Sequence, residues 1–147
     1  MGPLAKFIGY HLRVAQVAAF REFEARLTSF GMAPRYFGLL MLVEANPGAP
    51  QSRLAEAVHL DRSSLVPIID RLEQEGLLER RASGGDRRLK SVWLTREGEK
   101  LLSKLKPLAL QHEARLAAGF TPKEREQLLT MLGRLSENCG TPTRSPN

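Results

Sequence analysis

Residues 51–77 read QSRLAEAVHLDRSSLVPIIDRLEQEGL, and this pattern predicts two helices joined by a short turn. In the first helix, expected over about 51–58, the small residue Ala55 stands where a second helix can cross closely. Asp61 is expected to begin the second helix, because its carboxylate can accept hydrogen bonds from the free amide groups of the first turn. Gly76 supplies a left-handed stop at the other end. The stretch is therefore typical of a helix-turn-helix.

The turn between the two predicted helices holds two residues with separate roles. His59 belongs to the residue types that tolerate a positive φ, which such turns often need. Leu60 is expected to be buried between the helices. The same pattern also fits a plain helical hairpin in a bundle, so by itself it leaves both structures open.

The hydrophobic period changes from helical to alternating directly after this unit. Two strands are predicted over residues 77–81 and 89–94, and the glycine-containing segment 82–86 between them is typical of a hairpin tip. Short helices followed by a two-stranded hairpin have the order of a winged helix-turn-helix, whose second helix enters the major groove of DNA. The hairpin therefore favours a DNA-binding unit over a helical bundle.

Charge is divided unequally between these two elements. Residues 80–90 contain five basic side chains and one acidic side chain, a net charge of +4, whereas residues 61–75 carry a net charge of −2. A basic loop with glycines at its tip suits a narrow minor groove, where arginine is attracted by the enhanced negative potential. A solvated basic turn is the alternative. We expect the helix to read base edges and the hairpin to supply electrostatic attraction.

Helices are also predicted on both sides of this unit. One spans residues 4–27, and a second ends at the turn formed by residues 46–48. Thr95 is expected to cap a long helix that Pro107 kinks or divides, and Thr121 begins the last helix. These flanking helices carry more apolar residues than a small core can use, which indicates a second subunit; an intramolecular bundle is the alternative.

The predicted architecture is mainly α: a winged helix-turn-helix with a two-stranded β wing and flanking N- and C-terminal dimerisation helices. Its 147 residues are ordinary for one domain with attached helices. The expected divisions are an N-terminal dimerisation helix over 1–31, a DNA-binding core over 32–97, C-terminal dimerisation helices over 98–139 and a disordered tail over 140–147.

Composition narrows the class of protein further. The net charge of +6 and a sequence pI near 10.0 favour a polyanionic partner. The single cysteine, Cys139, permits no intrachain disulfide, so a reducing cytoplasm is the expected compartment. The longest apolar run, residues 36–43, is far shorter than a membrane span, and basic residues such as Lys6 and Arg13 interrupt every candidate for a secretory signal.

Catalysis is not expected. The three histidines, His11, His59 and His112, stand far apart and form no metal-ligand spacing with the lone cysteine. The sequence has no nucleophile elbow and no phosphate-binding glycine loop, so neither a metal nor another cofactor is predicted. A binder of RNA or single strands would need aromatic side chains among its basic residues, and here the aromatic residues concentrate before residue 40.

Several short motifs together resemble the MarR-type transcriptional regulators. They are LAEA (54–57), SSLV (63–66), IDRLEQEGL (69–77), ERR (79–81), DRR (86–88) and LTREG (94–98). The resemblance covers nearly the whole chain apart from the tail. It implies a homodimer that binds a pseudo-palindromic double-stranded DNA operator, usually as a repressor released by a small ligand or an oxidant.

The resemblance also implies which residues meet DNA. Contacts from the recognition helix and from the wing would come from Arg62, Ser63, Ser64, Pro67, Arg87 and Arg88, with Asp86 orienting Arg88 in the minor groove. Two positions depart from the family pattern. Pro67 stands where a polar or basic base-contacting residue is common, and Pro50 stands where Ser or Thr often caps the preceding helix. Both departures bear on operator specificity and leave the expected fold intact.

Two kinds of signal are consistent with this resemblance. An aromatic or anionic effector would bind between the first helix and the winged core, where the candidate residues are Tyr10, His11, Arg13, Tyr36 and Phe37. A histidine on an apolar face is nevertheless more often a packed residue of a core or an interface. A redox-responsive regulator is the alternative, but the first helix has no cysteine, and Cys139 has no adjacent Lys or Arg. A winged-helix protein-interaction module that does not bind DNA is the other class that stays open.

Overall fold

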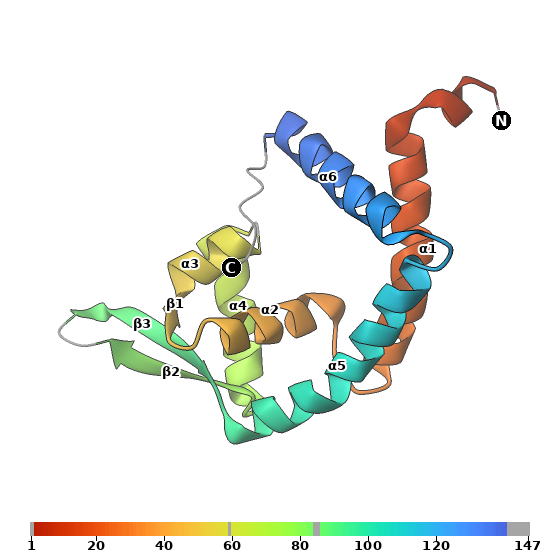
Figure 1. The fold of residues 1–147 in the computed structure, drawn as a ribbon. Helices are drawn as coiled ribbons and strands as arrows, with labels where there is room; N and C mark the ends of the chain where they lie inside the picture. The colour runs from red at the N-terminus through yellow and green to blue at the C-terminus, as the bar shows by residue number, and fades with distance from the viewer. Residues whose placement is uncertain (1, 59, 84–85, 141–147) are drawn as a thin grey trace.

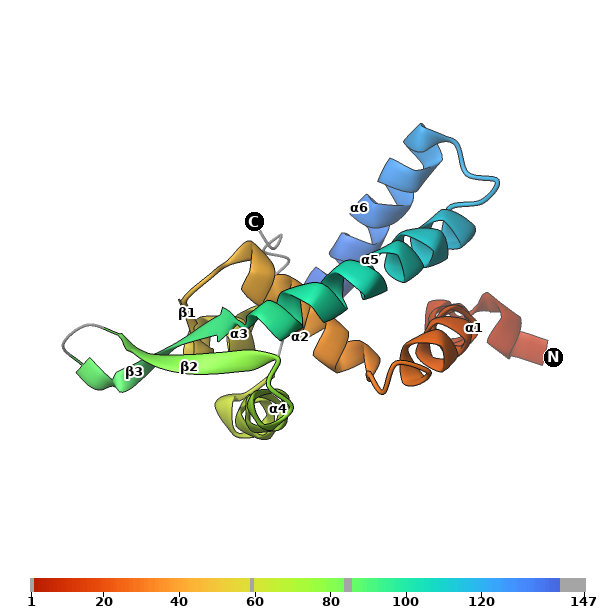
Figure 2. The ribbon, with the colours of Figure 1, turned by 90° about the horizontal axis from the view of Figure 1, so that it is seen from below.

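The computed structural model describes residues 2–58, 60–83 and 86–140, and the chain is mainly helical (Figure 1). Within these residues the elements are a 3-10 helix (Gly2–Lys6), α1 (Ile8–Thr28), α2 (Pro34–Ala45), β1 (Ala49–Pro50), α3 (Gln51–Ala57), α4 (Arg62–Gln74), β2 (Leu78–Ser83), β3 (Asp86–Leu94), α5 (Arg96–Leu116) and α6 (Pro122–Asn138). The sheet, α2, α3 and α4 form one body, and α5 leads from the end of β3 toward α1 (Figures 1 and 2). The expected winged helix-turn-helix is confirmed.

Local side-chain caps determine where three of the helices begin. Asp61, Thr95 and Thr121 each accept a hydrogen bond from the amide three residues further on, as the sequence predicts. Thr121 and Glu124 form a complete capping box. α1 begins at Ile8, later than expected, because the residues before it form the 3-10 turn.

α5 continues as a single helix through Pro107, so the expectation that this proline divides the helix is wrong. Pro107 is exposed and removes one backbone hydrogen bond. Leu102 and Leu105 are fully buried and hold the helix against the core, and Nζ of Lys106 lies 2.5 Å from Oε2 of Glu44 in α2. These tertiary contacts offset the missing hydrogen bond.

The sheet has three antiparallel strands in the order β1-β3-β2, one more than the expected two-stranded wing. The additional strand, β1, pairs Ala49 with Val92 and Pro50 with Ser91. A two-residue strand that contains proline has no alternating pattern, so the sequence did not reveal it.

The hairpin of β2 and β3 is also longer than expected. Its strands extend to Ser83 and from Asp86, and these two residues are paired. Most of the tip predicted over 82–86 therefore belongs to the strands. The remaining two residues, Gly84 and Gly85, lie outside the described part of the chain.

The core lies between the sheet, α2, α3, α4, α5 and the C-terminal end of α1. Its fully buried side chains are Leu27, Leu39, Leu40, Val43, Leu54, Leu65, Ile69, Leu72, Leu78, Val92, Leu102 and Leu105. Ala55 is buried at the crossing of α3 and α4, as expected. Leu60 is not buried: it is 37% exposed, and the half-buried Val58 packs against the core instead. The other turn residue, His59, lies outside the described residues.

α1 and α6 leave most of their apolar side chains exposed. In α1 only Phe23 and Leu27 are buried, and no residue within α6 is buried. The exposed apolar residues of these two helices are Ile8, Leu12, Val14, Val17, Phe20, Leu128, Leu129, Met131 and Leu132. Both helices project from the winged body (Figures 1 and 2), so their apolar faces have little of this chain to pack against.

Candidate nucleic-acid interface

The first turn of α4 presents short polar side chains at the surface. Oδ1 of Asp61 accepts hydrogen bonds from the amide of Ser64 at 2.7 Å and from the hydroxyl of Ser63 at 2.9 Å. Hydrogen bonds from Ser64, and then from Ser63, lower the pKa of Asp61 below its ordinary value. Both serines are exposed. The carboxylate therefore fixes the turn, while the hydroxyl oxygens can still accept hydrogen bonds from a ligand.

Arg80 joins the hairpin to both helices of the helix-turn-helix. Its side chain is only 12% exposed, and its Nη2 lies 2.6 Å from Oδ1 of Asp70. Its Nε donates to Oε1 of Gln51 in α3 at 2.8 Å, and its Nη1 lies 3.4 Å from Oε1 of Glu73. The backbone amide of Arg80 donates to Oε2 of Glu73 at 3.0 Å. These contacts hold β2 against α3 and α4.

Arg81 also has partners within the protein, although its side chain is 55% exposed. Its guanidinium lies 4.5 Å from the centre of the Trp93 ring and pairs with Glu79. Trp93 donates from Nε1 to Oγ of Ser91 at 2.9 Å, and that hydroxyl donates to the carbonyl of Arg81 at 3.1 Å. The two arginines of β2 therefore support the hairpin itself, and its net charge of +4 overstates the charge available to a ligand.

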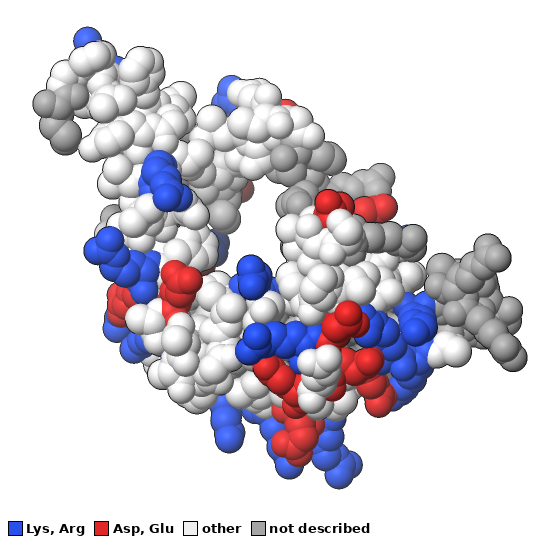
Figure 3. Space-filling view, turned by 180° about the vertical axis from the view of Figure 1, so that it is seen from behind, with Lys and Arg blue, Asp and Glu red and all other residues white. Residues whose placement is uncertain are grey.

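The surface beside the hairpin is mixed in charge. On the face seen in Figure 3, basic and acidic side chains alternate between the base of the hairpin and its grey tip. Apart from the two arginines of β2, the basic residues of the hairpin are Arg87, Arg88 and Lys90. Lys90 is exposed. The basic residues of the hairpin other than Arg80 and Arg81 therefore all lie on β3.

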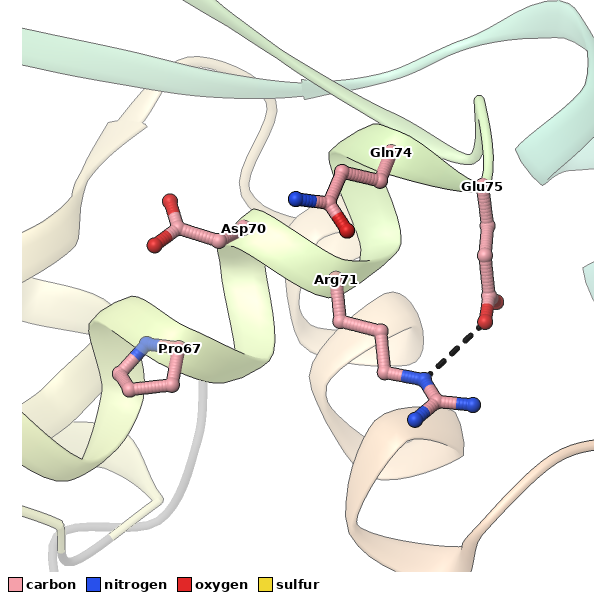
Figure 4. Close-up of a pocket in the computed structure, with 5 residues that line it drawn as sticks. All are labelled: Pro67, Asp70, Arg71, Gln74 and Glu75. Atoms are coloured by element: carbon pink, nitrogen blue, oxygen red, sulfur yellow. Dashed lines mark hydrogen bonds and ion pairs between the residues drawn. The ribbon is translucent and has the colours of Figure 1, made fainter.

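The middle of α4 carries a hollow of about 350 Å³, lined by Pro67, Asp70, Arg71, Gln74 and Glu75 (Figure 4). Pro67 is exposed and offers no amide hydrogen. Nε of Arg71 donates to Oε1 of Glu75 at 3.1 Å, so its charge is already paired. With two carboxylates around it, this hollow does not suit a phosphate group. Contacts with nucleic acid are therefore expected from the first turn of α4.

The structure describes only some of the predicted contact residues. Ser63, Ser64 and Pro67 lie exposed on α4. Four further side chains lie outside the described part of the chain, namely those of Arg62, Asp86, Arg87 and Arg88. The backbone of these four residues belongs to α4 and β3, and the roles of their side chains stay predictions.

Three of the predicted effector-binding residues lie near the start of α1. The rings of Tyr10 and His11 meet edge to face with their centres 5.4 Å apart. Nε2 of His11 lies 2.7 Å from the carbonyl oxygen of Ala5, and Arg13 donates to Gln16 at 2.9 Å. Both of these hydrogen bonds are on the exposed surface, so His11 is already satisfied locally.

The other two predicted effector-binding residues lie at the start of α2. Phe37 is buried, and its ring meets that of Phe23 edge to face at 5.8 Å. Tyr36 is half-buried, and its ring centre lies 5.0 Å from the guanidinium of Arg35 and 5.8 Å from that of Arg71. Within one chain the five candidates therefore form two separate groups.

A cluster of aromatic rings lies between α1 and α5, and no sequence pattern predicted it. The ring of His112 stacks on that of Phe23, with centres 4.6 Å apart and an interplanar angle of 12°. Phe20 lies 6.4 Å from the same histidine ring. Because the members come from separate helices, no pattern within one helix indicates their contact.

Two further observations concern metals and membranes. Among the described residues, no group of three or more His, Cys, Asp or Glu side chains is placed to hold a metal ion. Cys139 is a free and exposed thiol at the C-terminal cap of α6. In the part of the chain that the structure describes, no helix combines the length and apolar character of a membrane span.

The geometry of the winged body defines a class of protein. A short helix is followed by a capped helix with an exposed polar first turn, and Arg80 holds a hairpin against both helices. The hairpin extends away from α4 to one side of the molecule (Figure 1). These are the parts of a winged helix-turn-helix DNA-binding protein.

Similarity to known proteins gives the family. Residues 34–90 match the model of the MarR family. The chain is 36% identical over 135 residues to a putative transcriptional regulatory protein for the hcr operon of Thauera aromatica, which covers 91% of this chain and 81% of that protein. The chain belongs to the MarR family and is a transcriptional regulator of the MarR type.

Solved structures extend this similarity over nearly the whole chain. The transcriptional repressor CouR bound to a 23-mer DNA duplex is 35% identical, with a TM-score of 0.85 over 92% of this chain and 96% of that chain. CouR bound to p-coumaroyl-CoA is 33% identical, with a TM-score of 0.81 and the same coverage. The PcaV regulator from Streptomyces coelicolor, at 24% identity and a TM-score of 0.83 over 93% and 96% of the two chains, shares the fold.

Proposed function

We propose that this protein is a repressor that binds a pseudo-palindromic DNA operator as a homodimer and is released by an aromatic effector. The observation that carries the proposal is the capped and exposed first turn of α4 beside a hairpin held to the same helix. A unit of this shape reaches the major groove with the helix and the adjacent minor groove with the hairpin. A relative that is 35% identical was solved on a DNA duplex, which supports this mode of binding.

The recognition helix acts through its first turn in this proposal. Ser63 and Ser64 contact base edges or fix the register, and Arg62 meets a phosphate. Pro67 has no hydrogen-bond donor, so it offers an apolar surface of the kind that contacts a thymine methyl group. The net charge of −2 over 61–75 makes this helix a reader of bases rather than a source of attraction.

The wing supplies the attraction. Arg87 and Arg88 enter or border the minor groove, and Asp86 orients Arg88. Arg80 does not take part, because its nearly buried guanidinium is occupied by Asp70 and Glu73. Arg81 is exposed but already contacts Glu79 and Trp93, so its contribution is smaller than that of Arg87 and Arg88. The role of charge in DNA binding therefore falls on few residues, and single substitutions should have measurable effects.

The flanking helices supply the dimer. We assign residues 1–31 and 98–139 to contacts with the second subunit and residues 32–97 to DNA binding. Apolar faces as exposed as that of α6 are usually covered by another subunit. A two-fold axis between two chains would set the two α4 helices about 34–36 Å apart, which is one turn of DNA.

The effector class is an aromatic acyl thioester of coenzyme A. CouR, 33% identical to this chain, was solved with p-coumaroyl-CoA, a compound with an aromatic end and an anionic nucleotide end. The chain offers aromatic residues on α1 and α2 for the former, and exposed basic residues such as Arg13 and Arg35 for the latter. A free aromatic acid, which lacks coenzyme A, is the simpler alternative effector.

Fluorescence anisotropy with duplex DNA from upstream of its own gene tests DNA binding. We expect a dissociation constant of roughly 10⁻⁸ M or below, weakening steeply as salt rises. Arg88→Ala should weaken binding and lower the salt slope by about one. Lys123→Ala removes one exposed charge from α6 and should change neither quantity. An unchanged affinity and slope in Arg88→Ala would contradict the role of the wing.

The same titration separates the other classes of protein. If no duplex bound in a salt-dependent manner, the winged fold would serve as a protein-interaction module. If peroxide released DNA from the wild type but not from Cys139→Ser, the signal would be an oxidant. We expect peroxide to leave both bound, because the chain has no second cysteine to resolve an oxidised Cys139.

A further inference from the structure

His112 on α5 contains a buried polar atom without a partner. Its Nε2 is shielded from solvent and makes no hydrogen bond within residues 2–58, 60–83 and 86–140. Buried nitrogen atoms are nearly always hydrogen-bonded, because an unsatisfied one has lost its contact with water and gained nothing in return. The exceptions often mark the place of a group that binds there. The described residues therefore supply no partner for Nε2 of His112.

The surroundings of this nitrogen are aromatic. The imidazole lies flat against Phe23 at 4.6 Å, and Phe20 lies 6.4 Å away on the same helix as Phe23. Phe23 in turn meets Phe37 of α2 at 5.8 Å. Phe37 and Phe23 are 6% and 7% exposed, whereas Phe20 is 46% exposed. The aromatic rings thus extend from the core to the surface, and the unpartnered nitrogen of His112 lies among them.

Polar bridges hold α1 against α5 on both sides of the histidine. Arg26 donates from Nη1 to Oε1 of Gln111 at 3.0 Å, and Arg115 pairs with Glu22. Gln111 directly precedes His112, and Arg115 follows it within one helical turn. The bridges restrict the position of the backbone at His112. The exposed Phe20 side chain is the member of the aromatic group that is freest to move.

We infer that Nε2 of His112 hydrogen-bonds a hydroxyl group on the aromatic ring of the effector, whose ring packs beside Phe20 and Phe23. The inference rests on the proposed function, because it names the residue that recognises the aromatic end of that effector. A phenolic hydroxyl both donates and accepts, so it satisfies either tautomer of the imidazole. A flat ring suits the stacked aromatic walls. Phe20 turns outward to admit it. His11 cannot take this role, since its own Nε2 already meets the carbonyl of Ala5.

Binding of two matched thioesters tests the inference. p-Coumaroyl-CoA carries a ring hydroxyl, and cinnamoyl-CoA is the same compound without it. Isothermal titration should show that the wild type binds p-coumaroyl-CoA roughly 3- to 10-fold more tightly, as one hydrogen bond gives. His112→Phe keeps the stacking on Phe23 and removes the nitrogen. It should bind both thioesters equally, with the affinity of the wild type for cinnamoyl-CoA.

Two variants control this experiment. His112→Gln keeps a hydrogen-bonding group and should retain part of the discrimination, whereas His11→Phe should retain all of it. Unchanged DNA binding without thioester shows that each variant is folded. Equal affinity of the wild type for the two thioesters, or full discrimination in His112→Phe, would overturn the inference and leave the proposed effector class standing. If the wild type bound neither thioester, both would fall.

Discussion

Asp61 shows how a single carboxylate places the recognition helix. Its Oδ1 accepts from the amide of Ser64 and the hydroxyl of Ser63, so the two serines proposed to contact DNA are also the residues that close the cap. A substitution here should affect the start of α4 before it affects the core. A substitution of Asp61 should therefore affect both the stability of the protein and its proposed binding to DNA.

The cap should be lost in acid. Because the pKa of Asp61 is lowered on folding, its stabilising effect is complete above the ordinary value of 3.8 and disappears as the pH falls through the lower folded value. Asp61→Ala should therefore lower the urea midpoint at pH 7, and the difference from the wild type should narrow toward about pH 3. Asp61→Asn, a neutral cap, should show a smaller change at pH 7. A difference for Asp61→Ala that stayed constant with pH would contradict this account.

Gly98 in α5 lies close to the backbone of Leu77, the residue before β2. A Cβ atom at this position would lie 2.2 Å from the carbonyl oxygen of Leu77, which is backbone and cannot move aside. Gly98→Ala should therefore reduce the free energy of unfolding by about 1–3 kcal/mol. A Cβ atom at Gly38, inside α2, would instead have no neighbouring atom within 4 Å. Gly38→Ala should stabilise the protein by about 0.5–1 kcal/mol, and chemical denaturation of the two variants measures both effects.

Arg80 holds the hairpin and the recognition helix together. Its guanidinium and amide meet Asp70 and Glu73 of α4, and its Nε meets Gln51 of α3. The angle between wing and helix is thus set by a nearly buried side chain rather than by the loop between them. In the proposed function Arg80 therefore positions the wing and is not expected to contact a phosphate.

Replacing Arg80 should show whether this residue acts on DNA binding through the position of the wing or through its own charge. Arg80→Met keeps the aliphatic stem and should reduce the free energy of unfolding by about 1–3 kcal/mol, since Asp70 and Glu73 lose their partner. Operator affinity should fall, but the salt slope should stay near that of the wild type, because no counterion-releasing contact is lost. Arg88→Ala should lower the slope, as described above. A lowered slope in Arg80→Met would mean that Arg80 does meet phosphate. Arg80→Lys should be intermediate, because one ammonium group cannot serve all these partners.

The molecule as a whole is unusual in how little of α1 and α6 it buries. α6 contributes no buried residue, and Leu129 and Met131 are 52% and 53% exposed. The winged body by contrast has a closed core, to which α1 contributes Leu27 and α5 contributes Leu102 and Leu105. The chain therefore combines a packed winged body with helices whose exposed apolar faces, in the proposed function, pack against a second copy.

Charge placed on α6 should separate the subunits. Leu129→Glu introduces a carboxylate into the face proposed to be buried, so sedimentation should show a monomer at micromolar concentration. Operator affinity should then fall roughly 10-fold or more, because two half-sites are no longer bound together. Gln127→Glu adds the same charge at a neighbouring exposed position and should keep the dimer. A dimer that persisted in Leu129→Glu would exclude this face from the interface.

Several parts of this structure could be predicted from residues close together in the sequence. Asp61, Thr95 and Thr121 cap amides three residues away, so the helix starts follow from short stretches of chain. The alternating pattern likewise gave the hairpin, and the order of these elements gave the winged fold. The two candidate residues Ser63 and Ser64 followed from the family resemblance and from their place at the start of the second helix.

Other features depend on contacts between distant residues, and only the tertiary structure decided them. Gln51 stands 29 positions before Arg80, so no local pattern shows that the guanidinium is occupied rather than free for DNA. The rings of Phe23 and His112 meet only because α1 and α5 cross. The sequence by itself determined the helices, the hairpin and the family, because caps and periodicity act within a few residues. Which charges remain free and which nitrogen lacks a partner were decided by packing, because burial and pairing exist only once the chain has folded.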